Sequence, residues 1–244
     1  MIIKDEGYVL NSIKYGEKSL IVTILSASKG KITGYVNDGN SKKNRGIFQI
    51  GNKIFYEASG RLEENMKRLF RVELISPNAV NMMQDIKKLE LMSASVPMFI
   101  KLLNENEEVL LFYDIIGKFF TSNTLKEMFY HYALFEFYVL EYLGVGLMLD
   151  CCAVTGQTQD LYYVSPKTGK AVSKQIGAPY HDRLFKYPQF VVDKSDTPTY
   201  KEIFNVLEMT SYFLKENFFK FHNLKMPDSH HKITEILATL EDEA

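Results

Sequence analysis

The amino-acid sequence predicts an α+β protein in which a small all-β region is followed by a helical region. In roughly the first 76 residues, short apolar segments rich in β-branched side chains alternate with Gly-bearing turns. From about Pro77 the apolar residues recur instead at the three- and four-residue spacing of helices. The 244 residues are 46% hydrophobic and 24% charged, which is typical of a folded soluble protein.

Five short strands are predicted in the all-β region. They are GYVLNSIKY, SLIVTIL, ITGYV, GNKIFYEA and RLFRVELI, and polar or Gly-bearing turns separate them. In residues 31–36, side chains at every second position share a face, with Ile32, Gly34 and Val36 opposite Lys31, Thr33 and Tyr35. Five short strands this close together predict a small closed barrel or a sandwich.

Three helices are predicted next. They cover residues 89–103, 109–120 and 125–143, and Pro97 marks a kink or break in the first. Gly144 and Gly146 supply a stop signal after the third. Aromatic side chains of these helices are expected in the core, although some could line an apolar groove for a partner peptide: Phe112, Phe119, Phe120, Phe129, Tyr132 and Phe137.

Residues 147–195 are rich in loops and turns, with hairpin-like pieces at LYYVS and KAVS. Thr199 and Glu202 then form a capping-box pattern, which predicts the start of a long helix extending to about His222. A short terminal helix follows LKMPDSHH.

The net charge of −1 conceals an asymmetry along the chain. Residues 1–80 hold 13 Lys and Arg against 8 Asp and Glu, whereas the remainder holds 16 against 22. A basic N-terminal third indicates either a surface that faces a polyanion or ordinary surface solvation.

Compartment signals are few. The two cysteines, Cys151 and Cys152, are adjacent and give no disulfide framework. The charged start Lys4-Asp5-Glu6 does not resemble a signal peptide, and no apolar run of about 18 residues predicts a membrane span. We therefore expect a cytoplasmic protein without membrane contact.

Four segments resemble the RecO family of bacterial recombination mediators in order and spacing. They are DEGYVLNSIKYGEKSLIVTILSASKGKITGYVNDGNSKK, LFEFYVLEYLGVGLMLDCCAVTG, YYVSPKTGKAVS and LKMPDSHHKITEIL. The resemblance implies an N-terminal OB-fold domain over residues 1–78, a helical domain over 79–149 and 196–244, and a zinc-finger-like insertion over 150–195.

The resemblance also implies a function and partners. RecO proteins bind single- and double-stranded DNA, anneal complementary strands and contact the C-terminal tail of single-strand-binding protein. With RecR, and in some settings RecF, they help RecA displace that protein from single-stranded DNA. A nucleoid-associated location in the cytoplasm follows.

The predicted insertion lacks the ligand pattern of a structural zinc site. A structural zinc site needs four ligands, usually in Cys-x-x-Cys pairs. Thr155 stands where the partner of Cys152 would be, no later Cys exists, and the five His residues show no paired spacing with Cys152. We therefore expect no metal and no other cofactor, and an insertion held by packing, with a small core of Tyr162, Tyr163, Val164 and Ala171.

Six residues are candidate nucleic-acid contacts. In an OB fold, strand faces and loops bind nucleic acid through cations that neutralise phosphates and aromatic faces that stack on bases. The candidates are Lys29, Lys31, Tyr35, Lys42, Lys43 and Arg45. RecO proteins commonly have Lys and Arg where this chain has Asp38 and Asn40, which weakens the patch, and a mobile solvated loop is the alternative. A second candidate patch comprises Lys53, Arg61, Lys67, Arg68 and Arg71, and the sequence does not predict which side of the barrel these side chains face.

Enzymatic chemistry is not indicated. Glu136 lies among apolar residues and is interpreted as part of a structural ion pair or capping contact, because buried carboxylates need a partner. The sequence contains no hydrolytic triad and no phosphate-binding Gly-x-x-x-x-Gly-Lys loop. Two alternatives remain, a protein-interaction adaptor with only incidental DNA contact and an unrecognised hydrolase.

Overall fold

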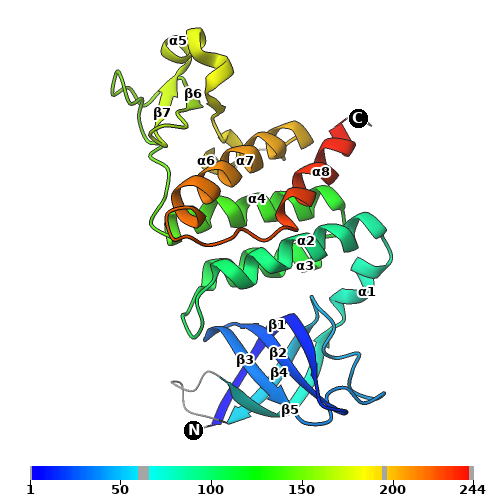
Figure 1. Cartoon of the computed structure of the whole chain (residues 1–244). Helices are drawn as coiled ribbons and strands as arrows, with labels where there is room; N and C mark the ends of the chain where they lie inside the picture. Colours follow the sequence, from blue (N-terminus) through cyan, green and yellow to red (C-terminus); the bar gives the residue numbers. More distant parts are fainter. Residues whose placement is uncertain (1, 60–65, 194–196, 242–244) are drawn as a thin grey trace. The chain divides into compact units, whose positions relative to one another are not determined.

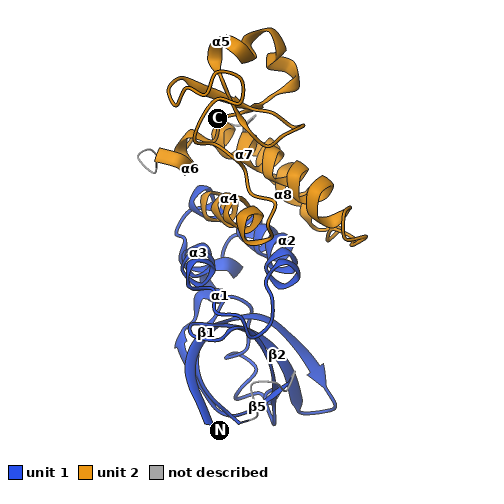
Figure 2. Cartoon of the chain, turned by 90° about the vertical axis from the view of Figure 1, so that its left-hand side faces the viewer, with its two compact units in different colours: residues 1–128 blue, residues 129–244 orange. Residues whose placement is uncertain are grey.

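The computed structural model describes residues 2–59, 66–193 and 197–241, and it confirms the predicted α+β class (Figure 1). The chain forms two compact units, residues 1–128 and 129–244 (Figure 2). The predicted division into an OB-fold domain, a helical domain and an insertion stays a prediction. None of the described helices is both long enough and apolar enough to cross a membrane.

The first unit begins with a closed five-stranded barrel. Its strands are β1 (Ile2–Tyr15), β2 (Ser19–Ser26), β3 (Gly30–Val36), β4 (Lys53–Ser59) and β5 (Lys67–Ser76). They close in the order β1-β2-β3-β5-β4, with all neighbours antiparallel except β3 and β5. A small five-stranded barrel is the architecture of the OB fold, so the barrel interpretation is confirmed over the sandwich.

Alternation of side chains fills the barrel interior. Ile32, Gly34 and Val36 of β3 are buried, whereas the alternating Lys31, Thr33 and Tyr35 are partly exposed, as predicted. The interior is dominated by aliphatic side chains, several of them fully buried: Val9, Val22, Ile24, Ile54 and Ala58. The outer face of β3 is thereby left for contacts with other groups.

Three helices complete the first unit. They are α1 (Asn78–Met83), which the sequence did not predict, α2 (Ile86–Leu102) and α3 (Leu110–Thr121). Asp85 caps α2 by accepting hydrogen bonds from the amides of Lys87 and Lys88. Pro97 lies inside α2, which continues for five residues beyond it, so the predicted break does not occur there.

Outside residues 147–188, the second unit contains further helices. They are α4 (Leu125–Tyr142), which starts just before the unit boundary, α6 (Gln189–Asp193), α7 (Tyr200–Phe213) with its π-helical continuation η2 (Leu214–Phe219), and α8 (His230–Glu241). The predicted capping box opens α7, because Thr199 Oγ1 accepts from the amide of Glu202 at 3.2 Å while a Glu202 carboxylate oxygen accepts from the amide of Thr199 at 2.7 Å.

A small sheet lies between α4 and α6 in the sequence. Its strands β6 (Leu161–Val164), β7 (Ala171–Ser173) and β8 (Phe185–Lys186) run in the order β7-β6-β8, and α5 (Lys174–Gly177) and the 3₁₀ helix η1 (Ala178–Arg183) follow β7. Val164 and Ala171 are fully buried and Tyr163 is nearly so, as predicted. The prediction for Tyr162 is wrong, because its side chain is 41% exposed.

Candidate nucleic-acid interface

The loop between β3 and β4, residues 37–52, carries three of the predicted cations and is folded into turns. The amides of Asn44 and Arg45 donate to the carbonyl of Ser41 at 3.1 and 3.0 Å. Phe48 is 3% exposed and packs in the barrel core. The loop is therefore anchored at its base, while Lys42, Lys43 and Arg45 are exposed.

Asp38 and Asn40, which weaken the basic patch, have structural roles in this loop. Asp38 adopts a left-handed backbone conformation with φ of 56°, which Asp tolerates better than most residues. The amide of Asn40 donates to the carbonyl of Lys18 at 2.8 Å, and its side chain donates to the carbonyl of Glu17 at 3.3 Å. These contacts join the loop to the β1–β2 turn.

An exposed aromatic pair lies at the same end of the barrel. The rings of Tyr15 and Tyr35 meet edge to face with centroids 5.9 Å apart, and Tyr15 is 58% exposed. The Tyr35 hydroxyl lies 2.8 Å from Ser19 Oγ. In the parallel pairing of β3 with β5, Tyr35 lies opposite Arg68. Tyr15 is not among the predicted contact residues, and only strand register places Arg68 beside Tyr35.

Lys29 and Lys31 lie at the other end of β3. A seven-residue strand spans roughly 20 Å, which separates these lysines from the loop cations along the barrel. The Lys31 ammonium donates to the carbonyl of Ile100 in α2 at 2.6 Å. Burial lowers the pKa of Lys31, and the nearby Glu105 carboxylate opposes that shift only in part. Lys29 is half-buried, and its amide donates to Ser26 Oγ.

The second predicted patch is largely neutralised. Lys53 pairs with Glu6 at 2.5 Å, and Arg71 pairs with Glu57 and Glu73. Lys67 is 2% exposed, and Arg61 lies outside the described residues. Arg68 is exposed and adjoins the aromatic pair.

The small sheet is held by packing and hydrogen bonds around Cys152. This residue is 1% exposed and clusters with Tyr163 and Val172, against which Ile176 packs. The amide of Ser173 donates to Cys152 Sγ at 3.3 Å. The residues that the structure describes include no group of three or more His, Cys, Asp or Glu arranged to hold a metal ion.

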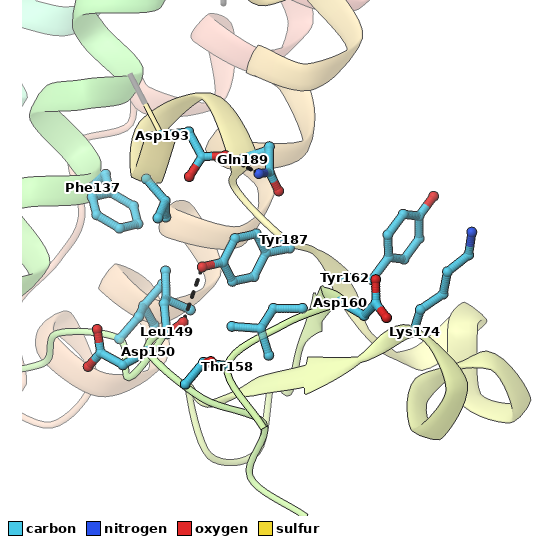
Figure 3. A pocket seen from close by; sticks show the side chains of 13 residues that line it. Phe137, Leu149, Asp150, Thr158, Asp160, Tyr162, Lys174, Tyr187, Gln189 and Asp193 are labelled. Atoms are coloured by element: carbon cyan, nitrogen blue, oxygen red, sulfur yellow. Dashed lines mark hydrogen bonds between the residues drawn. The ribbon is translucent and has the colours of Figure 1, made fainter. Parts of the chain in front are cut away.

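A cavity of about 780 Å³ lies within the second unit, between α4, α6 and the segment that leads into the small sheet (Figure 3). Phe137 and Leu149 form its apolar end, while Asp150, Asp160 and Asp193 make its wall acidic. Phe137 is the member of the predicted aromatic stripe that lines this cavity; the other members are buried core residues: Phe112, Phe119, Phe120, Phe129 and Tyr132.

Comparison with known proteins places these features in a family. Residues 1–78 match the family model described as "Recombination protein O N terminal", and residues 121–222 match "Recombination protein O C terminal". The chain is 35% identical over 231 residues to the DNA repair protein RecO of Bartonella tribocorum, covering 92% of this chain and 90% of the relative.

Two further relatives agree. The DNA repair protein RecO of Rickettsia bellii is 31% identical over 228 residues, which are 93% of each chain. That of Wolbachia pipientis is 35% identical over 233 residues, which are 92% of this chain and 95% of the relative. The chain belongs to the RecO family of non-enzymatic DNA repair and recombination proteins.

Proposed function

We propose that this chain binds single- and double-stranded DNA through the loop end of its barrel and anneals complementary single strands. The observation that carries the proposal is the grouping of three exposed cations on an anchored loop, Lys42, Lys43 and Arg45, next to the exposed Tyr15–Tyr35 pair. Cations that follow the phosphates and aromatic rings that stack on bases are the usual means of binding single strands.

The mechanism of annealing is charge neutralisation. Two phosphate backbones repel each other as they approach, and a cationic surface reduces that repulsion by displacing the counterions of the strands. Base pairing then drives the reaction. No covalent step and no nucleotide hydrolysis is required of the chain.

Partner proteins enter the proposal from membership of the family. We infer that the chain acts with RecR, and in some settings with RecF, to help load RecA onto single-stranded DNA coated by single-strand-binding protein. It contacts the C-terminal tail of that protein.

The proposal is tested by annealing fluorescent complementary oligonucleotides, with and without single-strand-binding protein, and by salt titration of DNA affinity. Lys42→Ala plus Lys43→Ala is expected to weaken binding and to reduce the salt slope by roughly one to one and a half, since each contact to a single-strand phosphate contributes about 0.7.

The matched control is Lys220→Ala plus Lys225→Ala. It removes the same charge from exposed lysines that pair with Glu216 and Asp228 in the second unit. Equal affinity and slope in the loop variant and the wild-type protein would exclude the loop as the DNA contact. Failure of the wild-type protein to bind oligonucleotides at low ionic strength would overturn the whole proposal.

An adaptor that binds partner proteins, with DNA contact only incidental, is the second candidate. The pairing of Lys53 and Arg71 with glutamates favours it, because that pairing removes cations from the barrel surface. A gel shift at about 150 mM salt separates the two functions, since the adaptor would show no DNA binding of its own there.

A further inference from the structure

An exposed tyrosine of the small sheet, Tyr162, is flanked by two lysines. The Lys186 ammonium lies 4.9 Å from the centre of the Tyr162 ring, and the Lys174 ammonium lies 5.2 Å from it. Figure 3 shows the side chains of Tyr162 and Lys174 extending to the same side, away from the Phe137 and Leu149 end of the cavity. Both distances are within the range of cation–π attraction.

Packing accounts for only part of this tyrosine. The rings of Tyr162 and Tyr163 meet edge to face with centroids 4.9 Å apart, and the Lys186 ammonium lies 5.1 Å from the centre of the Tyr163 ring. Tyr163 enters the small core, where it lies against Gly177. Tyr162 remains 41% exposed, with both lysines exposed beside it. A large aromatic ring held at the surface between two cations is suited to stack on a planar group of an anionic ligand.

The charge around this site favours an anion. Among the described residues neither Lys174 nor Lys186 forms an ion pair with a carboxylate, unlike Lys53 and Arg71 of the barrel. Although the chain beyond residue 80 is acidic, the segment 150–187 is basic. Its charged residues are Lys167, Lys170, Lys174, Arg183 and Lys186 against Asp150, Asp160 and Asp182.

We propose that Tyr162, Lys174 and Lys186 form a second contact for single-stranded DNA, separate from the barrel. A base stacks on the Tyr162 ring, and the two ammonium groups move to the flanking phosphates. Tyr162 and Lys174 line one end of the cavity that Asp160 and Asp193 also line, and these carboxylates repel phosphate, so the strand follows the lysine side of the ring. The inference rests on the proposed function, because a second contact would allow one protein to hold two strands during annealing.

The absence of Trp from the sequence allows a direct test. Tyr162→Trp introduces a single reporter, and its fluorescence is expected to be quenched when oligo(dT) is added, because stacking on thymine quenches indole. Tyr180→Trp is the matched control, since Tyr180 is 57% exposed in the same segment and has no lysine over its ring among the described contacts. No change at Tyr162→Trp while the protein binds oligo(dT) overturns the second site and leaves the barrel proposal intact.

Charge removal gives a second readout. In a Lys42→Ala plus Lys43→Ala background, the further pair Lys174→Ala and Lys186→Ala is expected to lower oligo(dT) affinity roughly tenfold. The control pair Lys167→Ala and Lys170→Ala removes the same charge from the turn between β6 and β7 and is expected to have a clearly smaller effect. Equal losses in the two pairs would show a diffuse charge effect and overturn the site. Quenching of Tyr162→Trp by oligo-glutamate but not by oligo(dT) would overturn it in favour of an acidic peptide.

Discussion

Glu136 of α4 and His230 of α8 are joined by a 2.6 Å contact between a carboxylate oxygen and Nε2, across 94 residues of sequence. Glu136 is fully buried, and the hydroxyls of Tyr132 and Thr210 also donate to its carboxylate at 2.6 Å each. Burial, reinforced by the neighbouring carboxylate, raises the pKa of Tyr132 well above its usual value, so this hydroxyl remains a neutral donor. The carboxylate predicted to need a structural partner thus has three.

Replacing Glu136 by Leu should lower the free energy of unfolding by about 3–5 kcal/mol, because breaking a buried pair leaves the other partners without their acceptor. Glu136→Gln should cost less, since it keeps one acceptor oxygen. Glu141→Gln is the control, because Glu141 is exposed on the same helix. Urea unfolding measures the differences, and equal midpoints for Glu136→Leu and wild type would contradict a structural role for the cluster.

A second prediction concerns the closure of the barrel at Gly34. A Cβ at this position would lie 1.8 Å from Leu69 Cδ1, where β3 meets β5. Gly34→Ala therefore overpacks a filled interior and should cost about 1–3 kcal/mol. Gly46→Ala is the control, since a Cβ there meets nothing within 4 Å. Thermal unfolding should show a lower midpoint for Gly34→Ala alone, and equal midpoints for the two variants would show that Leu69 can yield.

The features predicted correctly depend on residues close together in sequence. The alternation along β3 and the Thr199–Glu202 capping box are local patterns, and both are present in the structure. The number and spacing of the strands predicted a closed barrel or a sandwich, and the strand pairing shows that it is a barrel.

The features missed depend on register and tertiary contact. Tyr15 reaches Tyr35 only because β1, β2 and β3 pair in a particular register, and the Lys31 ammonium is held by a carbonyl 69 residues away. Tyr162 and Tyr163 are chemically equal neighbours, so the sequence alone could not show which of them would face the core. Local patterns thus predicted the strands and helices, whereas the residues that make up the candidate site could be identified only from the three-dimensional structure.

Lys31 and Lys42, two of the predicted DNA contacts, should therefore behave differently when replaced by Ala. Lys31→Ala removes the ammonium that donates to the carbonyl of Ile100 near the end of α2. Loss of this charged hydrogen bond is expected to cost about 1.5–3 kcal/mol of stability. Lys42→Ala removes an exposed cation and should affect DNA affinity with little change in stability. Thermal unfolding and a DNA titration of both variants check this. A Lys31→Ala protein of full stability and reduced DNA affinity would instead support Lys31 as a DNA contact and contradict its structural role.

The thiol of Cys152 gives a pH-dependent prediction. Burial opposes its ionisation, but hydrogen bonds from Thr155 and Ser173 outweigh burial and lower its pKa from 9.0 to about 6. A pKa lowered by folding contributes stability that is fully present above the unfolded value and is lost as pH falls through the folded value. The contribution of this thiol should therefore grow as pH rises from about 6 to about 9.

The measurement compares two proteins that both lack the exposed Cys151. Cys151→Ser retains the Cys152 thiol, whereas Cys151→Ser plus Cys152→Ala removes it, and other titrating groups cancel in the difference between their unfolding free energies. That difference in unfolding free energy should increase as pH rises from about 6 to about 9. Adding Ser173→Ala to Cys151→Ser should raise the pKa of Cys152, as followed by the ultraviolet absorbance of the thiolate, because it removes one of the stabilising hydrogen-bonding groups. A difference that stays constant between pH 6 and 9 would mean that Cys152 is an ordinary buried thiol, and the small sheet would then be held by packing alone.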